Sequence, residues 1–165
     1  MLKPFVGVHI NRGGNKMSAS FTQKDKYSTE DLLEIMRILR SPDGCPWDRK
    51  QTHESIRSHF VEETHEVLEA INANDSAALC EELGDVLLQV VLHCQIAADS
   101  DTFEFSEVVD GLCKKLVKRH PHVFGEVLAD NCDEIWKNWD RIKRESKQDK
   151  TQVNLLRWVP RSLPA

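Results

Sequence analysis

The sequence predicts an all-α fold, a four-helix-type bundle with a fifth helical segment, and it predicts that the protein is a dimer. Apolar residues recur at helical spacing in five segments, and these segments begin near residues that can cap a helix. No alternating strand pattern of any length is present. The expected helices cover residues 28–40, 52–72, 76–98, 106–119 and 130–147. A chain of 165 residues is long enough to bury one core of ordinary size.

The first helix is expected to begin at Ser28, because Ser28 and Asp31 have the spacing of a helix-start motif. Residues 1–27 show no periodicity and are interpreted as a flexible arm. Residues 41–46 combine Pro, Asp and Gly in a turn-rich break, after which Thr52 can cap the second helix. The ordered domain is therefore predicted to begin near residue 28.

The second helix carries an acidic residue inside its apolar stripe. At 100° per residue, Glu63 lies about 20° from Ile56, whereas Glu66 lies at the edge of the stripe, about 80° away. Glu62 lies further round, and His65 points to the opposite side. An ionised glutamate on a buried face is costly unless it is paired or bound to a metal. Glu63 is therefore a candidate ligand rather than a surface charge.

The third helix is apolar nearly all round. Such a helix is either central in its fold or lies in an oligomer interface, and this favours the dimer. Its polar exceptions Glu82, Asp85 and Gln89 cluster on one side.

Two carboxylate pairs, Glu63 with Glu66 and Glu82 with Asp85, each place both acids on nearly the same side of a helix. At an effective dielectric constant of ~20, like charges ~4 Å apart repel by roughly 4 kcal/mol. Four carboxylates brought together would need a cation, and oxygen-only ligation indicates Mg²⁺ or Mn²⁺. The alternative is a solvated acidic strip. Recurrence of the pair in two consecutive apolar helices favours the metal site.

A di-iron site is a second alternative for the acidic helices. Glu62 and His65 match the Glu-x-x-His element of di-iron four-helix bundles. Such a site needs a second element of this kind, but His93 has Val90 three residues before it. The sequence therefore disfavours di-iron chemistry.

Basic residues gather in the last two predicted helices of a chain whose net charge is −5. Lys115 and Arg119 share one helix face and could hold phosphates, although cations also offset the dipole at a helix C-terminus. Trp136 and Trp139 could stack on a base or pack in the core. The basic residues concerned are Lys114, Lys115, Lys118, Arg119, Lys137, Arg141, Lys143 and Arg144.

Overall composition excludes several classes of protein. The net negative charge gives no reason to expect nucleic-acid binding, and no apolar run reaches membrane-spanning length. Five cysteines without a Cys-x-x-Cys pair indicate neither a disulfide framework nor a zinc site. Free thiols fit a reducing cytoplasm, which is the predicted location.

Several motifs together resemble the bacterial MazG family of nucleoside triphosphate pyrophosphohydrolases, over about residue 28 to the C-terminus. Two of them, Cys-Pro-Trp-Asp and Arg-His-Pro-His-Val-Phe, narrow the resemblance from the wider all-α pyrophosphatase superfamily to MazG. The motifs are Pro42-Asp43-Gly44-Cys45-Pro46-Trp47-Asp48, Gln51-Thr52, Glu62-Glu63-x-x-Glu66, Glu82-Leu83-Gly84-Asp85 and Lys115-Leu116-x-x-Arg119-His120-Pro121-His122-Val123-Phe124.

The resemblance implies a MazG-like α-helical dimer that hydrolyses nucleoside and deoxynucleoside triphosphates to the monophosphate and pyrophosphate with Mg²⁺, for which Mn²⁺ is an expected substitute. It implies metal ligation by Glu63, Glu66, Glu82 and Asp85, with Glu62 beside them as an outer-shell group or water orienter. It implies phosphate binding by Lys115 and Arg119, with Trp139 and Lys143 nearby. It assigns Trp47, Asp48 and Gln51 to the nucleotide pocket.

No Gly-rich P-loop is present, and no Ser–His or Cys–His nucleophile is identifiable by spacing. Direct attack on the substrate by metal-activated water is therefore the expected mechanism.

The resemblance also predicts the domain organisation. We expect an arm over residues 1–27, a catalytic domain over 28–148 and a tail over 149–165 that is similar to an interdomain linker. Longer MazG proteins carry two such domains, and residues 159–165 resemble the junction that leads into the second. The alternative function is therefore a weakly active or non-catalytic half of a two-domain protein, which binds nucleotides or supports dimerisation.

Overall fold

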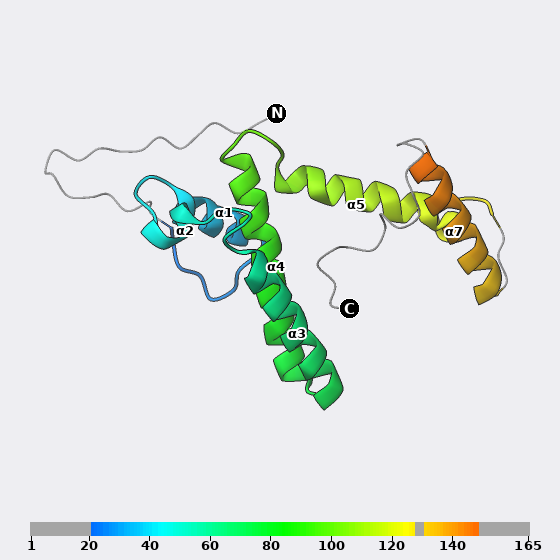
Figure 1. Cartoon of the computed structure of the whole chain (residues 1–165), viewed down its shortest axis with the longest axis horizontal. Helices are drawn as coiled ribbons and strands as arrows, with labels where there is room; N and C mark the ends of the chain where they lie inside the picture. Colours follow the sequence, from blue (N-terminus) through cyan, green and yellow to red (C-terminus); the bar gives the residue numbers. More distant parts are fainter. Residues whose placement is uncertain (1–20, 128–130, 149–165) are drawn as a thin grey trace, which may run out of the picture. The chain divides into compact units, whose positions relative to one another are not determined.

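The computed structural model describes residues 21–127 and 131–148, and within these ranges it is helical without any strand (Figure 1). This confirms the all-α prediction, whereas the number of bundle helices and the dimer stay predictions. The helices are α1 (Thr29–Arg40), α2 (Pro46–Lys50), α3 (Arg57–Ala73), α4 (Ser76–Ala98), α5 (Phe105–Arg119), α6 (Pro121–Phe124) and α7 (Cys132–Gln148). Most of the predicted arm and all of the predicted tail lie outside the described residues.

The chain divides into two compact units, residues 1–108 and 109–165, and each is described by itself. In the first unit α3 packs along α4, and α1 packs against both α4 and α2. None of the helices in the described ranges is long and apolar enough to cross a membrane.

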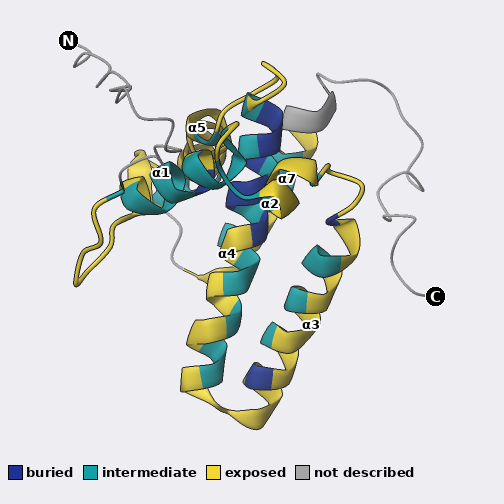
Figure 2. Cartoon of the chain, turned by 90° about the vertical axis from the view of Figure 1, so that its left-hand side faces the viewer, coloured by how far each residue is buried: buried dark blue, intermediate teal, exposed yellow. Residues whose placement is uncertain are grey.

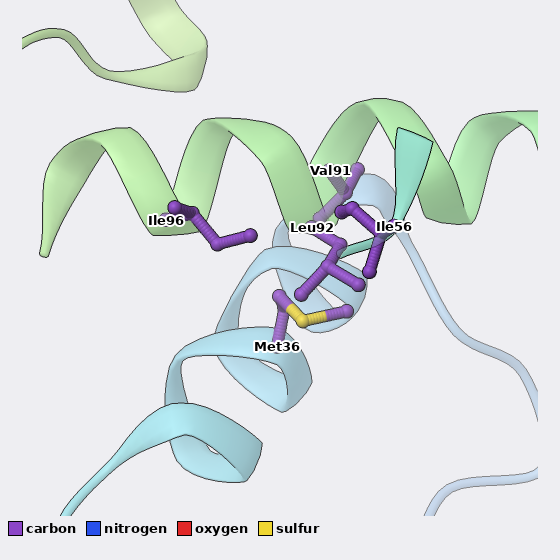
Figure 3. Packing of buried hydrophobic residues seen from close by; sticks show 5 residues of the cluster. All are labelled: Met36, Ile56, Val91, Leu92 and Ile96. Atoms are coloured by element: carbon purple, nitrogen blue, oxygen red, sulfur yellow. The ribbon is translucent and has the colours of Figure 1, made fainter. Parts of the chain in front are cut away.

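The core of the first unit lies where α1 meets α4. Met36 from α1 packs with Ile56, which precedes α3, and with α4 side chains (Figure 3). Met36, Ile56 and Val91 are at most 2% exposed. Burying each such side chain stabilises the fold by about 1.5–3 kcal/mol. The buried cluster consists of Met36, Ile56, Val91, Leu92 and Ile96, with Leu32, Leu33 and Phe105 packed against it.

Burial falls away towards the turn that joins α3 to α4. Figure 2 shows that the buried part of α4 is its half next to α1, while the hairpin end of both helices is exposed or half-buried apart from Ala70. Large apolar side chains remain exposed on both helices, so within the described part of the first unit they form an apolar surface. These side chains are Val61, Leu68 and Ile71 on α3, and Leu83, Leu87 and Leu88 on α4.

Local hydrogen bonds explain where the helices begin. Ser28 caps α1 as predicted: its Oγ accepts from the amide of Asp31, and its own amide donates to the Asp31 carboxylate. Asp75 caps α4, and its carboxylate accepts from two backbone amides. Asn74, with a φ of 53°, ends α3 in the left-handed region, which Asn tolerates. A two-residue connection therefore turns α3 back along α4.

Three predicted helix starts differ from the structure. Thr52 does not cap α3; Thr52 and Ser55 exchange hydrogen bonds in a separate turn, and the helix begins only at Arg57, after the buried Ile56. Ser106 lies within the first turn of α5 rather than before it. The last helix begins at Cys132, because Asn131 accepts a hydrogen bond from the amide of Glu134.

Two short helices, α2 and α6, were not predicted. Each begins with a proline, at Pro46 and Pro121, within a segment that the sequence marks as a break. Proline is favoured in the first helical turn because it has no amide hydrogen to leave unpaired. A proline-rich break can therefore contain a single helical turn.

Candidate metal and nucleotide site

The α3–α4 hairpin brings three carboxylates together. One oxygen each from Glu63, Glu66 and Glu82 lies within 4.8 Å of the other two. Glu63 and Glu66 are three residues apart on α3, so they project from neighbouring positions on one side of the helix. Glu82 comes from α4, which runs antiparallel beside α3. Glu63 and Glu82 are half-buried and Glu66 is exposed, so the cluster is open on one side.

Neighbouring carboxylates destabilise the ionised forms of Glu63 and Glu82. Partial desolvation raises the pKa of Glu63, and the charges of Asp85, Glu66 and Glu62 raise it further. The pKa of Glu82 is also raised, first by desolvation and then by the charge of Glu66 and a hydrogen bond between the two carboxyl groups. No cation among the described side chains forms an ion pair with any of the three carboxylates.

Asp85 and Glu62 lie beside this group rather than in it. Asp85 is not one of the three mutually close ligands, yet its charge raises the pKa of both Glu63 and Glu82. Glu62 is exposed, and its charge also acts on Glu63. The side chains as they stand therefore assemble three of the four expected metal ligands.

The donor set fits a hard divalent cation. All three ligands are carboxylates, which Mg²⁺ and Mn²⁺ prefer to nitrogen or sulfur, and an open side leaves room for water or phosphate oxygens. A bound cation would also remove the mutual repulsion that raises the pKa values of Glu63 and Glu82.

Trp47, Asp48 and Gln51, which the resemblance assigns to the nucleotide pocket, lie in or next to α2. The ring of Trp47 is 55% exposed. The Gln51 amide donates to the carbonyl of Trp47 at 3.0 Å and accepts from the hydroxyl of Ser55 at 2.8 Å. The side chain of Gln51 thus tightens this segment, while the Trp47 ring is available to a ligand.

In the second unit, two cations flank one tryptophan. The Arg119 guanidinium lies 5.1 Å from the centre of the Trp139 ring, and the Lys143 ammonium lies 4.7 Å from it. Trp136 meets the same ring edge-on at 5.8 Å and is itself 67% exposed. Arg119, Trp139 and Lys143 thus form one cation–aromatic cluster, and Lys115 is exposed one turn before Arg119 on α5.

Sequence reasoning missed three features of the first unit. The guanidinium of Arg40 is buried and joins three segments, although the sequence shows only an ordinary cation at a helix end. His53 and His93 lie with their Nδ1 atoms 2.7 Å apart. Gln89, noted only for its polarity, is 6% exposed, and its Oε1 has no hydrogen-bond partner. The contact between the two histidines and the burial of Gln89 could not be predicted from the sequence, because both depend on how the segments around α3 and α4 pack.

Sequence and structure comparisons show which proteins this chain is similar to. The MazG nucleotide pyrophosphohydrolase domain matches residues 51–124, which include all the acidic residues of the cluster. The nucleoside triphosphate pyrophosphohydrolase/pyrophosphatase MazG of Thermotoga maritima is 49% identical over 73% of this chain and 46% of its own length. The nucleoside triphosphate pyrophosphohydrolase of Escherichia coli K12 is 45% identical over 81% of this chain and 51% of its own length.

The chain thus spans about half the length of these two curated relatives. One solved structure is matched over nearly its whole length. It is a mazG-related protein from Thermotoga maritima, which aligns with a TM-score of 0.59 and 33% identity over 70% of this chain and 98% of its own. With the motifs, the helical fold and these matches in agreement, the chain belongs to the MazG family.

Proposed function

We propose that this protein hydrolyses nucleoside triphosphates, ribo- and deoxyribonucleotides alike, to the nucleoside monophosphate and pyrophosphate with Mg²⁺. The observation that carries the proposal is the group of three carboxylates, Glu63, Glu66 and Glu82, on the α3–α4 hairpin of a MazG domain. The names of the curated relatives support the reaction type.

The carboxylates are the proposed metal-binding residues. Glu63, Glu66 and Glu82 would hold Mg²⁺, or Mn²⁺ in its place, and Asp85 would join them once the cation offsets the repulsion among the four acids. A divalent cation held there would lower the pKa of water and offset charge on phosphate oxygens. Glu62, exposed beside Glu63, is suited to orient the attacking water and to accept its proton.

The remaining residues would bind the substrate. Lys115 and Arg119 carry the positive charge that offsets phosphate oxygens, and Lys143 lies with Arg119 on the Trp139 ring. The exposed Trp47 offers an aromatic face to the nucleoside, next to Asp48 and Gln51. In this mechanism water attacks the α phosphorus, and the bond from that phosphorus to the bridging oxygen breaks, so pyrophosphate leaves intact.

Product analysis tests the proposal. Pure protein with ATP and Mg²⁺ should yield AMP and pyrophosphate in equal amounts, with no ADP at any time. ADP with orthophosphate would instead show that the terminal phosphoryl group is transferred, and it would refute the assignment. A panel of ribo- and deoxyribonucleoside triphosphates would then rank the substrates.

The alternative function is nucleotide binding, or support of dimerisation, with little catalytic activity. Trp47 and the Arg119–Trp139–Lys143 cluster could serve nucleotide binding without turnover. Binding of ATP with Mg²⁺ but without turnover would support this alternative.

We also propose that the protein forms a homodimer in the cytoplasm. The exposed apolar side chains of α3 and α4 supply a surface that a second copy would cover. The cysteines are free thiols, as expected for a reducing compartment. Sedimentation at several concentrations tests the dimer.

A further inference from the structure

The guanidinium of Arg40 is buried at the junction of three segments. Arg40 is the last residue of α1, and its side chain is only 7% exposed. Its Nε donates to the Asp99 carboxylate at 2.6 Å. Its Nη1 donates to two backbone carbonyls, those of Asp48 and, at 3.2 Å, Gln51. Asp99, which follows α4, is held in turn by the side-chain amide of Gln95 at 2.8 Å.

The two carbonyls that Arg40 binds belong to the C-terminal end of α2. A helix of five residues is too short to be stable by itself. No residue of α2 is buried. The Asp48 carbonyl already accepts a hydrogen bond from the amide of Gln51 at 3.2 Å. Arg40 adds a second donor to that carbonyl, a hydrogen bond to the Gln51 carbonyl, and a positive charge at the negative end of the helix dipole.

Two hydrogen bonds fix the segment that leads into α2. The backbone amide of Cys45 donates to the carbonyl of Leu39 at 2.7 Å, and the side-chain Nη1 of Arg49 donates to the carbonyl of Pro42 at 2.6 Å. These bonds fix the position of the N-terminal end of α2, whereas the bonds from Arg40 fix the orientation of its C-terminal end. That direction decides where the Trp47 ring lies and how the chain enters the turn before Ile56.

We propose that Arg40, together with Asp99, is a positioning residue that holds α2 in its nucleotide-binding orientation. The proposal rests on the proposed function, because it takes α2 as the nucleoside-binding segment. Arg40 acts through the backbone carbonyls of Asp48 and Gln51, and it is not among the residues proposed to bind substrate or metal. The Asp99 carboxylate holds the guanidinium in place, so the carbonyls of α2 always meet the same donors.

Lysine should not replace this arginine. The planar guanidinium donates in several fixed directions at once, whereas a lysine ammonium cannot reach the carboxylate and both carbonyls in the same geometry. Arg40→Lys keeps the charge and loses the geometry, and Asp99→Asn keeps the shape and loses the charge. Arg37→Lys is the matched control, because Arg37 lies one turn earlier on α1 and pairs with Glu34 at the surface.

The full chain and these three variants would be compared in four measurements: KM and kcat for ATP, the Kd of ATP by calorimetry, the Kd of Mn²⁺ for the carboxylate cluster, and amide hydrogen exchange. Arg40→Lys and Asp99→Asn should raise KM and the Kd of ATP on the order of tenfold or more, with a much smaller change in kcat. Amides of residues 47–51 should exchange faster, while the α3–α4 amides and the Mn²⁺ affinity stay as in the wild type. Arg37→Lys should match the wild type throughout.

Unchanged ATP affinity in both variants would overturn the proposal, and so would a parallel loss of Mn²⁺ affinity, which would indicate general unfolding. A wild-type protein that binds ATP but does not hydrolyse it would refute the proposed activity alone, because the Kd and exchange measurements still test Arg40. A wild-type protein that binds no ATP would overturn both.

Discussion

At the level of single residues, the ionised forms of Glu63 and Glu82 are destabilised, and no described cation forms an ion pair with either carboxylate. Their pKa values are raised by desolvation and by neighbouring carboxylates, so in the absence of metal their ionised forms oppose folding. A carboxylate whose pKa is raised in the folded state stabilises the fold more as the pH falls through that pKa. The metal-free protein should therefore gain stability from these two groups on mild acidification.

Removing one of these charges should have opposite effects on the stability of the metal-free protein and on its affinity for metal. Glu63→Gln should leave the metal-free protein as stable as the wild type or more so, and it should weaken the binding of Mg²⁺. For the wild type, Mg²⁺ at ~100 times its Kd should add about 2.7 kcal/mol. Thermal unfolding with and without Mg²⁺ measures both effects. Glu69→Gln, an exposed substitution on the same helix, should change neither, and a wild-type melting curve unaffected by millimolar Mg²⁺ would contradict the metal site.

Steady-state kinetics should distinguish the proposed metal ligands from the proposed phosphate-binding residues. Glu66→Ala and Asp85→Ala should lower kcat by about a hundredfold or more, because metal-ion catalysis is worth several kcal/mol. Lys115→Ala and Arg119→Ala should mainly raise KM if their cations bind the substrate's phosphates before reaction. His65→Ala, exposed on α3, should change little and serves as the control. Steady-state kinetics with ATP would measure these effects, and a fully active Glu66→Ala variant would exclude Glu66 as a ligand.

At the scale of elements, the turn before α3 is tied to α4 by a pair of histidines. The rings of His53 and His93 lie 8° from parallel with centres 5.0 Å apart, and their facing nitrogens can share only one proton. Desolvation, and then the charge of His53, lowers the pKa of His93. A histidine with a lowered pKa contributes stability above its ordinary pKa and loses it as the pH falls through the lowered value.

This pair should therefore weaken the fold below about pH 6.5, the ordinary pKa of histidine. His93→Phe keeps a ring against Phe60 and removes the titrating group, so its melting temperature should fall less than that of the wild type over this range. Glu63 and Glu82 are present in both proteins, so their opposite effect on stability cancels in the difference between the two pH profiles. What remains is the contribution of His93. Parallel pH profiles for the two proteins would contradict the role of the pair.

The sequence could predict the long helices because local signals and the apolar pattern agree. Ser28 caps α1 in the structure, and Glu63 and Glu66 meet Glu82 as their spacing suggested. Other features depend on tertiary contacts. The start of α3 at Arg57 follows the burial of Ile56 rather than the capping signal at Thr52, and α2 depends on a guanidinium from another helix. The placement of Asp85 outside the three-carboxylate group depends on the register of α4 against α3.

At the level of the whole molecule, the exposed apolar side chains of α3 and α4 form the surface that we propose a second copy of the chain covers. Leu87 is 42% exposed in this chain, so Leu87→Glu should cost little in a monomer. In a dimer that covers this surface the same change would bury an unpaired charge. Sedimentation should show a concentration-dependent dimer for the wild type and for Leu87→Met, and a folded monomer for Leu87→Glu. A wild-type protein that stays monomeric at every concentration would contradict the dimer.

The position of oxygen incorporation tests the central claim most directly, namely that the carboxylate hairpin directs water to the α phosphorus. ATP and Mg²⁺ would be incubated with the protein in ¹⁸O-labelled water, and the products analysed by mass spectrometry. We expect one labelled oxygen in AMP and none in pyrophosphate, with the reaction abolished by a chelator and slowed about a hundredfold or more by Glu66→Ala. Label in pyrophosphate or orthophosphate, or a Glu66→Ala variant that turns over at the wild-type rate, would contradict this mechanism.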